Sequence, residues 1–167
     1  MTECWFLHNS GLGDHIIYNG LVRELSKNYD KLYLFCSSYN LNNVVFMYRD
    51  DPKIIVVDCC EDKAYDYWKA NGKGSFKSTL LRFKTPDLEY EQKWSKFSHF
   101  DQIPYFMEGI PFGFKTTSFY YQRDTEAEYK LFQELHCHEN PNYIFIHDSS
   151  SLGQHIVTGK QIGRAHV

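Results

Sequence analysis

The chain has 167 residues, of which 43% are hydrophobic and 17% aromatic, enough for a packed core and unlike a disordered composition. Its 18 basic and 21 acidic residues give a net charge of −3, which argues against nucleic-acid binding because such proteins usually carry a basic surplus. No apolar stretch approaches the roughly 20 residues that span a bilayer, and Met1–Trp5 lacks the features of a secretory signal. The sequence therefore predicts a cytoplasmic protein with no nucleic-acid partner and no integral membrane segment, and leaves its oligomeric state open.

The cysteines are odd in number and show no C-x-x-C spacing: Cys4, Cys36, Cys59, Cys60 and Cys137. Four of them lie within or beside predicted strands, so we expect reduced thiols that pack as small apolar side chains rather than disulfides. The tripeptide His136–His138 contains metal-binding residue types, but no second group of ligands stands at a suitable spacing. We interpret it as a polar helix end and predict no metal site.

The N-terminal third of the chain alternates between strand and helix patterns. The run Trp5–His8 predicts a strand, and apolar residues at three-to-four spacing from Asp14 predict one helix that ends near Asn28. Residues Lys31–Cys36 read as a strand buried on both faces, followed by a helix over about Leu41–Tyr48 and a strand over Ile54–Val57. This β-α-β-α-β order predicts an α/β fold, a Rossmann-like open parallel sheet flanked by helices.

The remaining elements are less regular. A helix is expected over Glu61–Asn71 and a short strand around Thr79–Phe83. The aromatic-rich stretch from about Lys84 to Arg123 is interpreted as helix, short helix and loop packed on the sheet. Asp124–His136 is expected to be a helix because acidic residues suit its first turn, and Tyr143–His147 is expected to be a last strand.

One local motif has a chemical rationale: the loop Ser10–Asp14 (Ser-Gly-Leu-Gly-Asp) between the first strand and the first helix. Glycines allow a sharp turn and close approach of a ligand, and a helix start offers unpaired N–H groups. The motif fails as a dinucleotide fingerprint, because Ile16 occupies the third glycine position and no acid follows the second strand. Asp14 is expected at the N-cap or in the first helical turn, at the sheet edge where open α/β sheets bind ligands.

The N-terminal strand, the Gly11–Asp14 loop, the helix and an early small residue together resemble the opening of bacterial heptosyltransferases and related GT-B sugar transferases (glycosyltransferase family 9). The resemblance covers about the first 60 residues and the stretch near 143–151. It implies transfer of a sugar from a nucleotide-activated donor to an acceptor hydroxyl, with Asp14 as the general base. It implies no cofactor, since GT-B enzymes typically need no bound metal.

The resemblance also implies a division of the chain. Residues 1–140 would be the Rossmann-like, acceptor-side domain, and residues 141–153 the start of a truncated second domain. Residues 154–167 would be a non-native tail, because the last six or seven residues resemble the translation of a sequencing adapter. A chain cut in this way is expected to have no transferase activity by itself.

The candidate site combines the loop with the end of the last predicted strand. The expected catalytic residue is Asp14, and the expected substrate-binding residues are Asn9, Ser10, Gly11, Gly13, His15, His147, Asp148 and Ser149. His15 is equally consistent with a surface position in the first helical turn, and Asn9 and Ser10 with a plain turn. Two other functions stay open: a non-catalytic Rossmann-like module whose glycine loop holds an anionic ligand, and a GT-B-like sugar-nucleotide epimerase.

Overall fold

The computed structural model describes residues 2–80, 99–135 and 139. The chain divides into two compact units, residues 1–122 and 123–167, and each is described by itself. The predicted domain boundary at residue 140, the strand over 143–147, the tail 154–167 and the tripeptide His136–His138 all lie outside the described residues.

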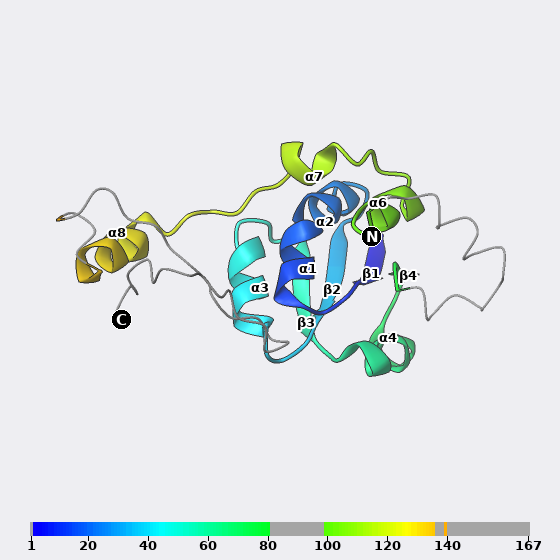
Figure 1. Ribbon diagram of the computed structural model, residues 1–167. Helices are drawn as coiled ribbons and strands as arrows, with labels where there is room; N and C mark the ends of the chain where they lie inside the picture. The colour runs from blue at the N-terminus through cyan, green and yellow to red at the C-terminus, as the bar shows by residue number, and fades with distance from the viewer. Residues whose placement is uncertain (1, 81–98, 136–138, 140–167) are drawn as a thin grey trace, which may run out of the picture. The chain divides into compact units, whose positions relative to one another are not determined.

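The first unit is built on a parallel sheet. Its four strands are β1 (Glu3–Leu7), β2 (Lys31–Cys36), β3 (Ile54–Asp58) and β4 (Ser75–Ser78). They lie in the order β3-β2-β1-β4, and every neighbouring pair is parallel (Figure 1). The predicted α/β class with a Rossmann-like parallel sheet is confirmed. The chain adds β2 and β3 on one side of β1 and then returns to the other side for β4, which makes the β1–β4 boundary the switch point of the sheet.

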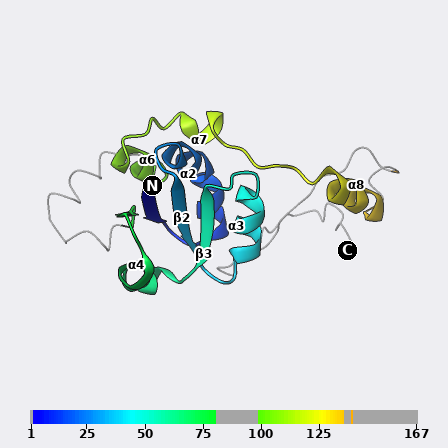
Figure 2. The same cartoon turned by 180° about the vertical axis from the view of Figure 1, so that it is seen from behind.

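Helices lie on both faces of the sheet (Figure 2). The helical segments of this unit are α1 (Leu12–Ile17), α2 (Asn19–Ser26), α3 (Leu41–Tyr48), the 3-10 turn η1 (Glu61–Lys63), α4 (Ala64–Asn71), α6 (Gln102–Met107) and α7 (Phe114–Thr117). The expected helices over 41–48 and 61–71 are confirmed, the second as η1 followed by α4.

The fourth strand lies earlier in the chain than the predicted one. Of the strand expected around Thr79–Phe83, Thr79 and Leu80 follow β4, which ends at Ser78, and are not in a strand, whereas residues 81–83 lie outside the described residues. The reason is Gly74, whose φ of 85° turns the chain from α4 directly into the sheet. A Cβ at Gly74 would lie 2.2 Å from the carbonyl oxygen of Glu3, so both the turn and the close approach to β1 require glycine.

The two central strands place alternate side chains on opposite faces. Residues such as Phe6 and Leu34 pack against α2 and α3, and residues such as Trp5 and Phe35 join a second cluster with α4. The ring of Trp5 stacks on that of Tyr33 at 4.1 Å between centroids. Burial on both faces explains why these strands read as nearly continuous apolar runs.

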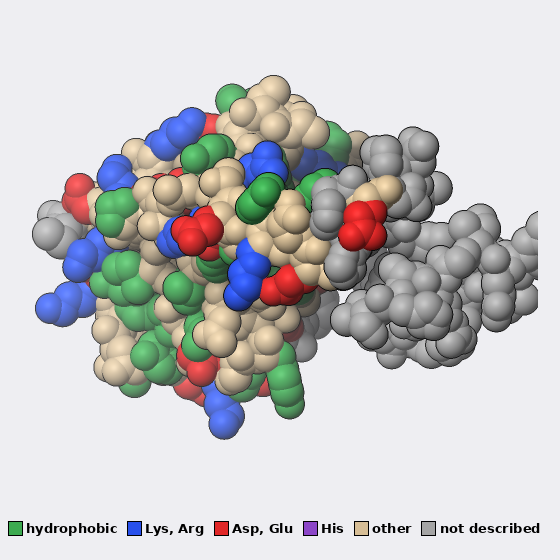
Figure 3. Space-filling model, turned by 90° about the vertical axis from the view of Figure 1, so that its left-hand side faces the viewer, with side chains coloured by type: hydrophobic (Ala, Val, Ile, Leu, Met, Phe, Trp, Pro, Cys, Tyr) green, Lys and Arg blue, Asp and Glu red, His purple; other side chains and the backbone are tan. Residues whose placement is uncertain are grey.

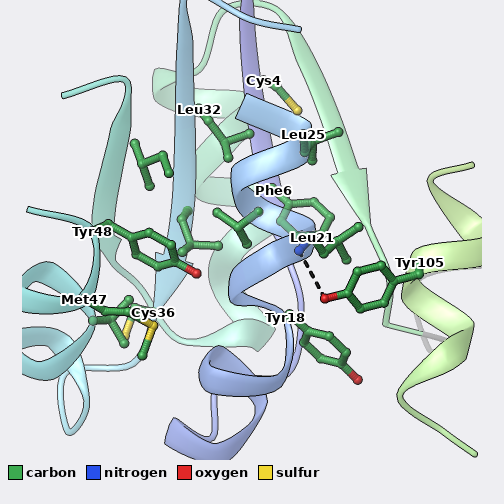
Figure 4. Close-up of a cluster of buried hydrophobic side chains, with 14 residues drawn as sticks. Cys4, Phe6, Tyr18, Leu21, Leu25, Leu32, Cys36, Met47, Tyr48 and Tyr105 are labelled. Atoms are coloured by element: carbon green, nitrogen blue, oxygen red, sulfur yellow. Dashed lines mark hydrogen bonds between the residues drawn. The ribbon is translucent and has the colours of Figure 1, made fainter. Parts of the chain in front are cut away.

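The single helix predicted from Asp14 to Asn28 is broken at Tyr18 into α1 and α2. Tyr105 of α6 causes the break: its hydroxyl accepts from the N–H of Leu21 (3.2 Å; Figure 4). The same hydroxyl donates to the carbonyl of Ile17 (3.1 Å). In a continuous helix these two backbone groups, four residues apart, would bond to each other. The inserted hydroxyl therefore replaces one rung of the helix and ties α6 to the core.

Helix α2 packs against α7 through a glycine, and this contact is testable. A Cβ at Gly20 would lie 2.1 Å from the carbonyl oxygen of Phe114, whereas a Cβ at Gly13 of α1 meets nothing within 4 Å. We expect Gly20→Ala to lower the free energy of unfolding by about 2 kcal/mol, because backbone rather than a flexible side chain must move. The matched Gly13→Ala should leave stability unchanged or raise it by up to about 1 kcal/mol. Urea denaturation of both variants checks this, and equal effects would contradict the packing of α2 on α7.

The described part of the second unit is helix α8 (Thr125–Glu134). Asp124 caps it by accepting a bond from the N–H of Ala127 (3.0 Å), and Glu126 and Glu128 lie in its first turn. The helix predicted over Asp124–His136 is therefore confirmed over its described part.

The surface of the described residues carries both charge signs. On the face drawn in Figure 3, acidic and basic side chains are interspersed with apolar ones. No helix within the described ranges is long and apolar enough to cross a membrane. Of the described cysteines, Cys4, Cys36 and Cys59 are buried free thiols as expected, whereas Cys60 is free and exposed.

Candidate functional site

The loop after β1 is held by two side chains from distant parts of the chain. The N–H of Ser10 donates to Oε1 of Glu61 (2.6 Å), and the carbonyl of Ser10 accepts from Nδ2 of Asn40 (2.7 Å). Asn40 precedes α3, and Glu61 follows β3 in η1. Both contacts lie at the carboxyl edge of the sheet, so residues that follow β2 and β3 hold the loop in place.

The motif glycines lie at the start of α1. Gly11 is the N-cap residue, without a side-chain cap, and Asp14 is the third residue of the helix. The N-cap position considered for Asp14 is thus wrong, and its first-turn position is confirmed. A Cβ at Gly11 would lie 2.6 Å from Oδ2 of Asp14, so glycine at this position leaves room for the carboxylate to lie over the helix start. Asp14 is partly buried.

Two histidines are fully buried beneath this loop. The rings of His8 and His15 contact each other edge to face with 4.4 Å between centroids, and neither side chain is exposed. Nδ1 of His8 donates to the carbonyl of Asn9 (2.6 Å). Nε2 of His8 and both ring nitrogens of His15 have no hydrogen-bond partner among the described residues. Burial lowers the pKa of His8 to about 4 and that of His15 to about 2, so both rings are neutral at pH 7. The surface position considered for His15 is wrong.

A pocket of about 320 Å³ opens at the switch point of the sheet. Its polar lining residues are Asn9, Glu61 and Thr79, and Tyr18, Leu80, Phe100, Ile103 and Pro104 supply its aromatic and apolar part. Asn9 follows β1 and Thr79 follows β4, the two strands between which the direction of the sheet order reverses. This is the place where open α/β sheets bind ligands.

Carboxylates lie in the lining of this pocket and close to it. Glu61 lines the pocket. The pKa of Tyr18 is raised, mainly by burial and in addition by the carboxylates of Asp14 and Asp101. Lys115 forms an ion pair with Asp101. Among the described lining residues there is no Lys or Arg.

The structure gathers only part of the predicted site. Asn9 lines the pocket, Ser10 is the clamped residue, Gly11 and Gly13 start α1, and Asp14 lies beside the pocket without lining it. His15 is enclosed in the core. His147, Asp148 and Ser149 lie outside the described residues.

Of the lining residues, sequence reasoning predicted Asn9 alone and missed the other seven, which include Glu61, Tyr18 and Thr79. Glu61 had a usable signal, because it follows shortly after a predicted buried strand and the carboxyl ends of parallel strands share one edge. Tyr18 was assigned to an uninterrupted helix. Thr79 was assigned to a strand, but β4 ends before it, at Ser78.

Comparison of the chain with protein families, curated proteins and solved structures found no match. Within the described residues, no three His, Cys, Asp or Glu side chains are grouped as metal ligands.

Proposed function

We propose that this chain provides the acceptor-side domain of a GT-B-type glycosyltransferase, in which Asp14 is the general base for the attacking hydroxyl. The observation that carries the proposal is the position of the Gly11–Asp14 loop at the carboxyl edge of β1, beside the switch-point pocket. A partly buried carboxylate at the start of a helix, next to a pocket, is suited to accept a proton from a bound hydroxyl.

The charge of the pocket supports the acceptor role over the donor role. A nucleotide-sugar donor carries a diphosphate, which favours basic side chains or helix N-termini. Within the described residues, no Lys or Arg lines the pocket, and Lys115 is paired with Asp101. The donor phosphates would then be bound elsewhere, and the pocket would receive the acceptor.

Asp14→Asn tests the general base in protein expressed from the complete gene. We expect turnover of the nucleotide sugar to fall at least about 100-fold, as is usual when a general base is lost, with donor affinity unchanged. The control is Asp66→Asn, an exposed carboxylate on α4, which should retain full turnover. Steady-state kinetics with a labelled donor measure both. Unchanged turnover in Asp14→Asn would exclude the base.

A non-catalytic binding module is the second candidate function. The observation in its favour is that Asp14 lies beside the pocket rather than in its lining. Such a module would bind a ligand at the pocket and would leave nucleotide sugars unchanged. An epimerase would convert the labelled donor without any acceptor. Product analysis of the same reactions therefore separates the three functions.

A further inference from the structure

Two neighbouring cysteines lie between the sheet and a residue that holds the loop after β1. Cys59 directly follows β3, and Cys60 is the N-cap residue of η1, which begins at Glu61. Both thiols are free; that of Cys60 is exposed and that of Cys59 is buried. Glu61 accepts the hydrogen bond from the N–H of Ser10 (2.6 Å). A change of the backbone at the two cysteines would therefore reach a support of the loop.

Hydrogen bonds hold the backbone of the two cysteines in the reduced chain. The N–H of Cys59 donates to the carbonyl of Cys36 (2.9 Å), and the carbonyl of Cys60 accepts from the N–H of Lys63 (3.1 Å). Cys60 is extended, with φ −68° and ψ 152°. Successive side chains of an extended backbone point to opposite sides. Bringing the two sulfur atoms together therefore requires a rotation of the backbone between them.

Cys59 is the described thiol that Cys60 can reach. The thiol of Cys59 donates to the carbonyl oxygen of Cys60 (3.5 Å), so its sulfur lies toward its neighbour in the chain. Cys4 and Cys36 belong instead to the core cluster on the opposite face of the sheet from Cys59. Burial covers the thiol of Cys59 and raises its pKa. The exposed thiol of Cys60 is therefore the first to meet a reagent from solvent.

A disulfide between consecutive residues is strained. Consecutive Cα atoms lie about 3.8 Å apart, whereas the Cα atoms of disulfide-linked cysteines are usually about 4.4–6.8 Å apart. Strain makes such a bond easy to reduce, which is typical of regulatory disulfides rather than structural ones. The bond also forms only when the peptide between the two cysteines rotates, and Glu61, the next residue, moves with it.

We propose that Cys59 and Cys60 form a reversible redox switch, in which a small-molecule disulfide oxidises them to a disulfide with each other and thereby withdraws Glu61 from Ser10. The thiolate of Cys60 attacks one sulfur of the reagent and releases half of it as a thiolate. The thiol of Cys59 then loses its proton to water, attacks the sulfur of Cys60 and displaces the other half as a second thiolate. Two cysteine thiols are oxidised, and one disulfide is reduced to two thiols. The switch acts on the loop whether or not Asp14 is a general base.

Oxidised glutathione, added to the ¹⁵N-labelled chain, tests the switch. Peptide mapping by mass spectrometry should show a disulfide between Cys59 and Cys60 without bound glutathione, and dithiothreitol should restore both thiols. Hydrogen exchange at the Ser10 amide should become at least about tenfold faster in the oxidised chain, because its bond to a carboxylate is lost. The amide of Leu21, which is bonded to the hydroxyl of Tyr105 in the core, should exchange at an unchanged rate.

Two variants separate the steps of the switch. Cys59→Ala retains the exposed thiol and should stop at a mixed disulfide between Cys60 and glutathione, with exchange at Ser10 unchanged. Cys137→Ser is the matched control, because it removes a thiol elsewhere in the sequence. It should form the disulfide and accelerate exchange at Ser10 as the wild type does.

Three results would overturn the proposal. A mixed disulfide that persists on Cys60 of the wild type, or no reaction there, would exclude the disulfide between neighbours. Unchanged exchange at Ser10 in the oxidised chain would exclude the coupling through Glu61. Equal acceleration at Ser10 and Leu21 would show general unfolding instead of release of the loop.

Discussion

Arg23→Ala is expected to lower the free energy of unfolding by about 3 kcal/mol, because it leaves a partly buried carboxylate without its cation. The guanidinium forms a two-bond pair with Asp50 (2.9 and 2.8 Å) and also donates to the carbonyls of Met47 (3.1 Å) and Tyr120 (2.9 Å). It lies over the rings of Tyr48 and Tyr120. One side chain thus joins α2, the end of α3 and the segment after α7.

Lys27→Ala is the matched control for this prediction. Lys27 is exposed, lies just after α2 and pairs with Glu24 (2.5 Å), so its removal should cost less than about 1 kcal/mol. Urea denaturation at pH 7 measures both variants. Similar losses would show that Arg23 does not have the central structural role assigned to it.

The same pair predicts a pH effect of defined sign. The hydrogen bonds from Arg23 hold the pKa of Asp50 below its usual value. The stabilisation is therefore present above the unfolded pKa of Asp50 and is lost as the pH falls through the folded one. The difference in stability between wild type and Arg23→Ala should shrink over that window.

The second large effect is a loss of stability in mild acid caused by His8 and His15. Burial lowers the pKa of these side chains to about 4 and about 2, against about 6.5 in the unfolded chain. Below pH 6.5 the unfolded state therefore binds two protons that the folded state does not. Stability should fall as the pH decreases, by about 1.4 kcal/mol per pH unit for each histidine until about pH 4, where His8 protonates in the folded state.

His15→Leu isolates half of this effect. Leucine removes from the core two ring nitrogens that have no hydrogen-bond partner in the part of the chain that the structure describes. It should reduce the slope of unfolding free energy against pH, between pH 6 and 4.5, by about 1.4 kcal/mol per unit. His99→Gln replaces an exposed histidine and should retain the wild-type slope. Urea titrations at several pH values give the slopes, and an unchanged slope in His15→Leu would refute the assignment.

The position of the loop beneath which these histidines lie could be predicted, but its supports could not. The predicted first strand, the turn at Gly11–Asp14 and the helix start after it are local patterns, and the structure contains them. The hydrogen bonds that Ser10 makes with Glu61 and Asn40 join residues that are 51 and 30 positions apart in the sequence. A periodic pattern within a short stretch of sequence carries no information about contacts between residues so far apart.

The local pattern also gave a wrong prediction for the first helix. The apolar spacing from Ile16 to Leu25 continues through Tyr18, so it indicates one helix. The break depends on the hydroxyl of Tyr105, a residue 84 positions beyond Leu21. Such an insertion is decided by tertiary packing and leaves no mark in the sequence around Tyr18.

The sequence by itself determined the α/β class, the helices over 41–48 and 61–71 and the strands over 31–36 and 54–57, because burial on one or two faces imposes a spacing that can be read locally. It also indicated which loop carries the candidate base. Only the tertiary structure decided the order β3-β2-β1-β4, the pocket beside β4 and the burial of His8 and His15. These features arise where strand ends and helices distant in sequence meet, and their energies depend on contacts that form only after the chain has folded.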